Sequence, residues 1–137
     1  MIDSKQSDEF VVVSNGMLGY GFREQSLWDA IEAGVDLIAV DAGSSDPGPY
    51  YLGSGTCFVG DDMTRRDLRL LVKAGYEARV PLIIGSSGGA GGDKQVDAVL
   101  AILADVIAEL GIQRKVITVR SELDKPMVRE AILGQRI

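Results

Sequence analysis

Residues 35–55 read VDLIAVDAGSSDPGPYYLGSG, an apolar run that passes directly into a long segment rich in glycine, serine and proline. The run Val35–Val40 lacks a clean alternation of polar and apolar residues, which is typical of a parallel strand buried on both faces. The continuation contains few residues that favour helix or strand. We therefore predict a strand at the carboxyl edge of a parallel sheet, followed by a long loop that faces a ligand.

Similar apolar runs and amphipathic patterns alternate along the rest of the chain. The other predicted strands are Phe10–Val13, Pro81–Gly85 and Lys115–Val119. Helical periodicity separates them, with starts predicted near Arg23, Thr64, Asp93 and Asp124. Alternating strands and helices predict an α/β fold, with a three-layer, Rossmann-like parallel sheet of about four strands and helices on both faces.

Size and composition fit one domain of 137 residues, with 46% apolar and 25% charged residues. We expect residues 1–9 to form a flexible tail. Residues 10–137 are expected to form a single α/β ligand-binding domain, either complete or the amino-terminal part of a longer protein. In either case we expect other residues to complete the site, supplied by a homo-oligomer or by a second domain or chain.

The charge balance narrows the class of partner. A net charge of −6 argues against nucleic acid, because phosphate backbones are bound by clustered Lys and Arg. No apolar run approaches the roughly 20 residues of a membrane span, so no membrane partner is expected. The single cysteine, Cys57, excludes an internal disulfide and favours a reduced, cytoplasmic setting.

The chain contains no histidine. This excludes a Ser-His-Asp triad, a Cys-His pair and a His-ligated zinc built from this chain. Proton transfer would therefore depend on Asp, Glu, Lys, Tyr, Cys or water. Without a histidine to activate it, Cys57 is interpreted as a buried and unreactive thiol.

Glycine-rich loops are predicted after three strands, so they should meet at one edge of the sheet. They are NGMLGYG (residues 15–21), the loop from Asp41 to Gly60, and GSSGGAGGD (residues 85–93). We interpret this edge as a binding site, although tight strand-to-helix turns also need glycine. The predicted ligand-binding residues are Asn15, Gly16, Gly19, Ser44, Ser45, Tyr50, Tyr51, Ser86, Ser87, Gly88, Gly89 and Gly91.

The third of these loops leads directly into a predicted helix. Successive backbone N–H groups in such a turn can bind a phosphate, a carboxylate or a thioester oxygen, and the helix start adds partial positive charge. Lys94 lies outside a P-loop frame, and the carboxylate of Asp93 could occupy the same helix start. A plain turn is therefore the alternative interpretation.

Two aspartates in the long loop are the candidate catalytic residues. Asp41 follows a strand, which would fix its backbone and aim its carboxylate, and Asp46 follows within the loop. Mg²⁺ is a compatible cofactor for such acids, but the cofactor stays open. The glycine spacing G-x-x-G-x-G in the first loop disfavours NAD, which requires G-x-G-x-x-G. The alternative is that Asp41 organises the loop by accepting backbone hydrogen bonds.

Four stretches together resemble a known family: SNGMLGYGF, IAVDAGSSDPGPYYLGSG, PLIIGSSGGAGG and SELDKPMVREAI. They are similar to the amino-terminal region of the acyclic terpene utilisation family. The resemblance implies a Rossmann-like α/β protein associated with catabolism of branched acids, in some cases as coenzyme A thioesters. It also implies a longer protein, since members of the family usually extend well beyond this length.

Two functions are therefore expected from the sequence. The first is a catabolic enzyme domain with lyase-like or hydrolytic chemistry. It would bind a small anionic metabolite, a carboxylate or an acyl-CoA thioester, at the glycine-rich loops. The second is a non-catalytic nucleotide- or metabolite-binding subunit that acts with a partner chain.

Overall fold

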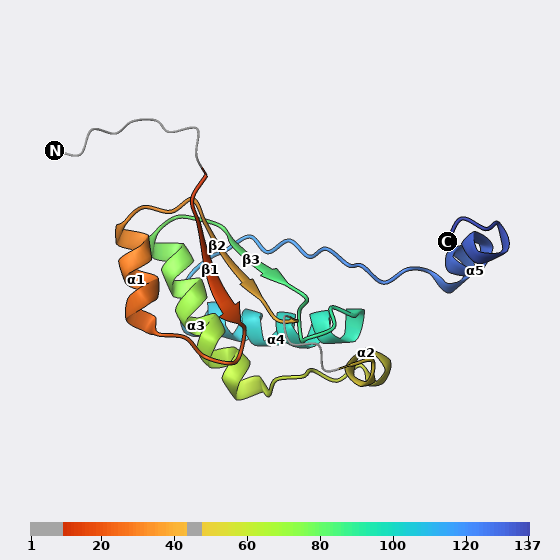
Figure 1. Ribbon diagram of the computed structural model, residues 1–137. Helices are drawn as coiled ribbons and strands as arrows, with labels where there is room; N and C mark the ends of the chain where they lie inside the picture. The colour runs from red at the N-terminus through yellow and green to blue at the C-terminus, as the bar shows by residue number, and fades with distance from the viewer. Residues whose placement is uncertain (1–9, 44–47) are drawn as a thin grey trace.

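The computed structural model describes residues 10–43 and 48–137, and it confirms an α/β fold with an open parallel sheet (Figure 1). The predicted tail, residues 1–9, lies outside the described part. The strands are β1 (Val12–Met17), β2 (Leu37–Asp41) and β3 (Leu82–Gly85). The helices are α1 (Glu24–Glu32), α2 (Tyr50–Ser54), α3 (Asp61–Glu77), α4 (Asp93–Glu109) and α5 (Lys125–Leu133).

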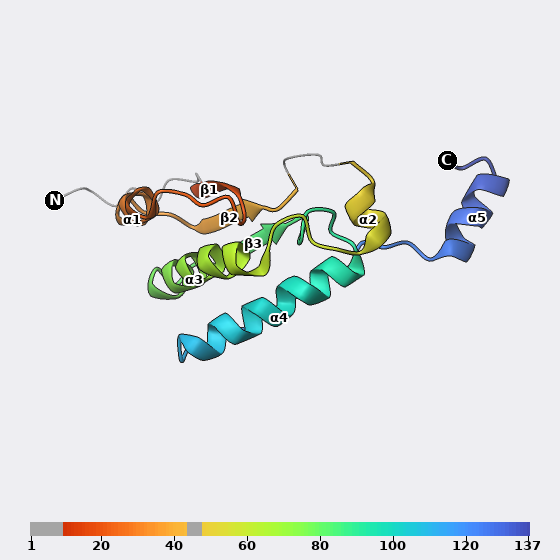
Figure 2. The same cartoon turned by 90° about the horizontal axis from the view of Figure 1, so that it is seen from below.

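The sheet has the order β1-β2-β3, and both strand pairs are parallel. Val12 is opposite Leu37, and Ile38 is opposite Leu82. Each connection moves one strand further in the same direction. Right-handed crossovers of this kind place the connecting helices on one face of the sheet. Figure 2 shows α1, α3 and α4 as a layer along that face.

The core lies between this helix layer and the facing side of the sheet. Ile38 and Val40 of β2 are 0% and 5% exposed, because side chains at alternate positions of a strand point to the same face. They pack with the apolar stripes of the two long helices. These stripes contribute Leu68, Leu71, Val72 and Ala74 from α3, and Val99, Ile102 and Val106 from α4.

Helices α3 and α4 also contact each other through charged groups on the surface. The guanidinium of Arg65 lies 2.8 Å from a carboxylate oxygen of Asp105 and 2.8 Å from one of Glu109. These exposed pairs contribute little stability but favour the side-by-side arrangement of the two helices. The start of α3 at Asp61 lies one turn before the predicted start, and Thr64 is buried inside the helix.

Two details of the sheet differ from the prediction. The structure has three paired strands, and the predicted fourth strand, Lys115–Val119, is extended but does not belong to the sheet. Helices α1, α3 and α4 lie on one face of the sheet rather than on both. Val12 and Ile83 on the opposite face are therefore 44% and 54% exposed. The cause is topological, since a continuous order of strands gives no crossover to the second face.

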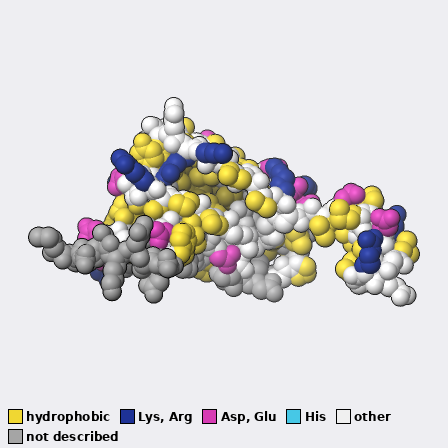
Figure 3. Space-filling view, turned by 90° about the horizontal axis from the view of Figure 1, so that it is seen from above, with side chains coloured by type: hydrophobic (Ala, Val, Ile, Leu, Met, Phe, Trp, Pro, Cys, Tyr) yellow, Lys and Arg dark blue, Asp and Glu magenta, His cyan; other side chains and the backbone are white. Residues whose placement is uncertain are grey.

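The chain beyond α4 leaves the body of the molecule. Residues 113–127 are exposed, and α5 stands apart from the other helices (Figures 1 and 3). Leu133 and Ile132 of α5 are 79% and 57% exposed. The apolar face of α5 is therefore not covered by any described element of the chain.

Candidate functional site

The loops after β1, β2 and β3 lie together at the carboxyl edge of the sheet, as predicted (Figure 1). We call the described residues of these loops, 18–23, 42–43, 48–60 and 86–92, the rim. The second and third loops are joined by a backbone hydrogen bond, in which Phe58 N–H donates to Gly88 O over 2.9 Å. A Cβ added at Gly19 would lie 2.3 Å from Val59, so the first and second loops are also in close contact.

The first loop is held by Asp67, which the sequence analysis did not select as a site residue. The side chain of Asp67 is 1% exposed, and its Oδ2 accepts hydrogen bonds from Gly19 N–H (2.7 Å) and Gly21 N–H (3.1 Å). Its Oδ1 accepts a hydrogen bond from Arg66 Nε at 2.9 Å. The signal in the sequence is an acid beside Leu68 on the apolar face of α3.

The long second loop is held by Gln95, which is also 1% exposed and was also missed. Its Nε2 donates hydrogen bonds to Tyr51 O (2.6 Å) and Thr56 O (3.2 Å). These two carbonyls lie at α2 and just after it, so α4 fixes the far part of the loop. The prediction of a long loop without helix is wrong for part of this segment. Tyr50–Ser54 forms a short helix, α2, which ends at Gly55 with φ of 73°.

The third loop begins with a turn in which Gly89 N–H donates to Ser86 O over 2.9 Å. Gly88, the third residue of this turn, has φ of 72°, as a type II turn requires. Ser86 itself has φ of 47°, a left-handed conformation that is uncommon and strained outside glycine. The backbone N–H groups of Ser86, Ser87 and Gly88 donate no hydrogen bond within the described part of the chain.

The start of α4 interacts with a carboxylate of the chain. Asp93 N–H donates to Oε1 of Glu122 over 2.7 Å. Gly92 is the N-cap residue of α4, and the helix begins at Asp93. No side chain makes a capping hydrogen bond at this helix start. The anion at this helix start is therefore a carboxylate of the same chain, that of Glu122.

Asp41 is half-buried at the end of β2, where its Oδ1 accepts a hydrogen bond from Gly43 N–H at 2.9 Å. This contact is the loop-organising role that was the alternative interpretation. Its other oxygen, Oδ2, accepts no hydrogen bond within the described residues and is available to a ligand. In residues 10–43 and 48–137, no group of three or more acids or cysteines is arranged to hold a metal ion.

Aromatic rings connect the first and second loops. Tyr51 lies between Tyr50 and Phe58, with ring centroids 5.2 Å apart in both edge-to-face pairs. Phe58 also contacts Tyr20 of the first loop at 6.3 Å. Tyr51 therefore belongs to the packing of the rim, whereas Tyr50 is 68% exposed and can contact a ligand.

Besides Asp41, Tyr50 and Tyr51, the predicted site residues fall into three groups. Ser86, Ser87, Gly88, Gly89 and Gly91 lie together in the third loop, next to Gly43 of the second. Gly16 and Gly19 lie at the end of β1 and in the loop after it. Ser44, Ser45, Asp46 and the side chain of Asn15 lie outside the described residues.

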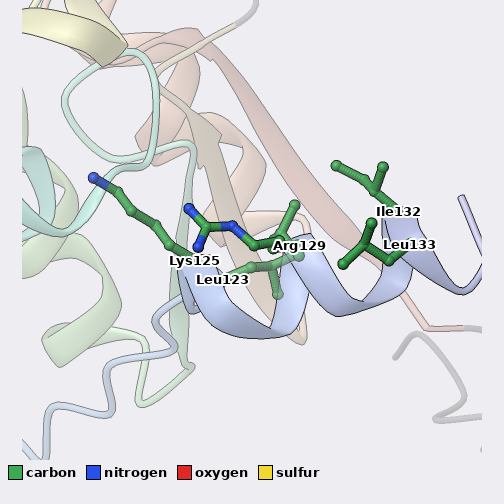
Figure 4. A pocket seen from close by; sticks show the side chains of 6 residues that line it. Leu123, Lys125, Arg129, Ile132 and Leu133 are labelled. Atoms are coloured by element: carbon green, nitrogen blue, oxygen red, sulfur yellow. The ribbon is translucent and has the colours of Figure 1, made fainter.

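Two cavities in the described part of the chain lie away from the middle of the rim. A cleft of about 750 Å³ lies along β3 and reaches the rim at Ser87. A hollow of about 330 Å³ is lined by Leu123 and residues of α5, as Figure 4 shows. All six lining residues of this hollow come from the C-terminal segment, so the body of the molecule does not enclose it.

Cys57 is half-buried in the second loop. Burial raises the pKa of its thiol, and the negative charge of Asp61 raises it further. A raised pKa means a smaller thiolate fraction at any pH below it, and the thiolate is the reactive form. These properties fit a structural thiol.

We expect iodoacetamide to label Cys57 several-fold more slowly in the folded protein than in urea at pH 8, because folding raises the thiol pKa. The difference should shrink as the pH rises through the folded pKa. Mass spectrometry of the carbamidomethylated protein measures both rates, and N-acetylcysteine in the same urea solution controls for denaturant. Equal rates in the two states would contradict the assignment.

Comparison of the chain with protein-family models, with curated proteins and with solved structures finds no match. Within the described ranges, no helix combines the length and the apolar character needed to cross a membrane.

Proposed function

We propose that this chain is a ligand-binding domain of a catabolic enzyme, and that it takes a small anionic metabolite, a carboxylate or an acyl-CoA thioester, at the third loop of the rim. The observation that carries the proposal is the run of unbonded N–H groups at Ser86, Ser87 and Gly88 in a strained turn. Strain of this kind concentrates at functional sites, and successive free N–H groups bind anions.

Three glycines of the other two loops, Gly19, Gly21 and Gly43, offer no free N–H group to a ligand. The N–H groups of Gly19 and Gly21 are bonded to Asp67, and that of Gly43 is bonded to Asp41. Their contribution is close approach, since a Cβ at Gly43 would lie 2.6 Å from the Cβ of Ser86. Anion binding is therefore assigned to the third loop rather than spread over all three.

Asp41 is the proposed catalytic base of lyase-like or hydrolytic chemistry. It lies at the end of β2, beside the end of β3, and its Oδ2 is free to accept a proton or a hydroxyl hydrogen bond. The resemblance to the acyclic terpene utilisation family supports an acyl thioester as ligand, and the single cysteine of the chain supports a cytoplasmic setting.

A second candidate is a non-catalytic metabolite- or nucleotide-binding subunit that acts with a partner chain or as a homo-oligomer. The exposed apolar side chains of the C-terminal segment favour it. Val119, Leu133 and Ile137 are 83%, 79% and 79% exposed, and such groups are usually buried against a partner. An Asp41→Asn variant separates the two candidates, because it should bind ligand but lose turnover if the chain is catalytic.

Anion binding can be tested with inorganic phosphate, short carboxylates and acetyl-CoA in a thermal-shift titration. A ligand present at ~100 times its dissociation constant should stabilise the fold by roughly 2.7 kcal/mol. A Ser87→Asp substitution should weaken binding at least about tenfold, because it places a carboxylate beside the free N–H groups. Gln113→Glu makes the same charge change at an exposed position beyond α4 and should bind like the parent.

Two results would contradict the proposal. One is the absence of any shift with all three classes of anion. The other is equal weakening by Ser87→Asp and Gln113→Glu, which would mean that affinity follows net charge rather than the third loop. Circular dichroism of both variants checks that each is folded before its binding is compared.

A further inference from the structure

The outer edge of β3 is open. Ile38 N–H donates to Pro81 O and Ala42 N–H donates to Gly85 O, each over 3.0 Å, so alternate residues of β3 direct their backbone toward β2. Leu82 and Ile84 lie between them and therefore direct their N–H and C=O groups outward. No hydrogen bond from another described segment reaches these groups. An unpaired edge of this kind is a template for a further strand.

Residues 114–122 form an extended segment beyond α4 (Figure 1), which we call the strap, and residues 114–119 line the same cleft as β3. At its beginning, the guanidinium of Arg114 donates to Val80 O (3.4 Å) and lies 5.4 Å from the ring centroid of Tyr76. Both contacts lie next to the start of β3. The strap is therefore held near the amino end of that strand.

The other end of the strap is held at the start of α4. The carboxylate of Glu122 accepts a hydrogen bond from Asp93 N–H, and the guanidinium of Arg120 pairs with Asp97 and lies 3.5 Å from Asp93. The start of α4 follows the carboxyl end of β3. The two sets of contacts thus give the strap the same direction as β3.

A cleft of about 750 Å³ separates the strap from β3 and the helices. Its walls are mostly apolar side chains from β3, α3, α4 and the strap itself, including Leu82, Leu100, Leu103 and Val116. Charged side chains, among them Arg79, Arg114 and Lys115, also line it. On the strap, Val116, Ile117 and Val119 are 47%, 75% and 83% exposed. Closing the cleft would remove both apolar surfaces from water, which is the main driving force for packing.

From these contacts we propose that the strap closes onto the edge of β3, where Lys115–Val119 pairs with it as a parallel strand. The open form described here and the closed form are two conformations of the strap. The β-branched residues of the strap favour pairing in a sheet. The tethers at both ends reduce the entropy lost on closure. The connection through α4 would continue the right-handed winding of β1-α1-β2 and of β2-α3-β3. This inference does not depend on the proposed anion site.

Hydrogen exchange of the Leu82 and Ile84 amides tests the closure. Their N–H groups point outward, so closure should slow their exchange on the order of tenfold or more relative to an open edge. Ile83 faces β2 and serves as the protected reference, while Gln113 serves as the exposed one. The protection should be independent of protein concentration. Rapid exchange at Leu82 and Ile84 would overturn the proposal, and protection that appears only at high concentration would assign the edge to a second copy.

A pair of proline variants provides an independent test. In an edge strand, successive residues direct their N–H groups to opposite sides, so Ile117→Pro and Thr118→Pro should differ. The variant whose N–H group faces β3 should lose a hydrogen bond between the strap and β3, and the Leu82 and Ile84 amides should then exchange rapidly. The variant whose N–H group faces away from β3 should have a small effect. Gln113→Pro, before the strap, is the control. If neither variant changes these amides, the strap does not pair with β3.

Discussion

Replacing Asp67 by alanine is expected to lower the free energy of unfolding by about 3–5 kcal/mol. The Asp67 carboxylate is 1% exposed and accepts hydrogen bonds from Gly19 N–H and Gly21 N–H. Without it, two backbone donors lose their partner, and Gly19 is itself buried. The guanidinium of Arg66, which is 52% exposed, can turn to solvent, so most of the cost arises at the loop.

Urea denaturation followed by circular dichroism measures this loss. Asp62→Ala is the matched control, because Asp62 is exposed in the first turn of the same helix and should cost about 1 kcal/mol or less. Asp67→Asn should fall between the two, since its amide retains one acceptor oxygen. If Asp67→Ala and Asp62→Ala had equal effects, Asp67 would not be holding the first loop.

Replacing Gly88 by alanine is expected to destabilise the fold by about 2–4 kcal/mol, from the sum of backbone strain and overpacking. Gly88 has φ of 72°, a conformation that costs any residue with a Cβ. An added Cβ would also lie 2.6 Å from Cβ of Gln95 and 2.8 Å from Sγ of Cys57. Gln95 is buried and bonded to two carbonyls, so it has little freedom to move aside.

Gly111→Ala separates the two causes. Gly111 has φ of 62°, but an added Cβ there would meet nothing within 4 Å. It should cost about 1 kcal/mol from backbone strain alone. Denaturation of both variants gives the difference, which measures the crowding between the second and third loops. If Gly88→Ala cost no more than Gly111→Ala, the rim would be loosely packed.

Hydrophobic periodicity was sufficient to predict most of the secondary structure. The apolar runs around Ile38 and Ile83 form β2 and β3, and Val96 and Val99 of the predicted apolar stripe lie on the buried face of α4. These patterns are local, because a strand or helix must place its apolar residues at a fixed repeat to bury them. The gathering of the three loops at one edge follows from the same parallel order of strands.

Asp67 and Gln95 illustrate what the pattern did not give. Each is a polar residue within an amphipathic helix, and sequence alone does not tell which backbone groups it will reach. Asp67 bonds residues 46 and 48 positions earlier in the chain, and Gln95 bonds residues 39 and 44 positions earlier. Such partners are defined by how the helices pack on the sheet. The glycines of the rim are comparable, since close approach rather than free amides explains Gly19 and Gly43.

Lys115–Val119 shows the difference between what a local sequence pattern predicts and what tertiary contacts decide. Its β-branched composition predicted a strand, and in the structure the segment is extended but unpaired beside β3. The sequence by itself determined the α/β class, the parallel strands and the edge at which the loops meet, because periodicity and chain direction are properties of short segments. The tertiary structure decided which face the helices cover, which side chains hold the rim and which edge is left open. Those features depend on contacts between residues distant in the chain, and no local pattern encodes them.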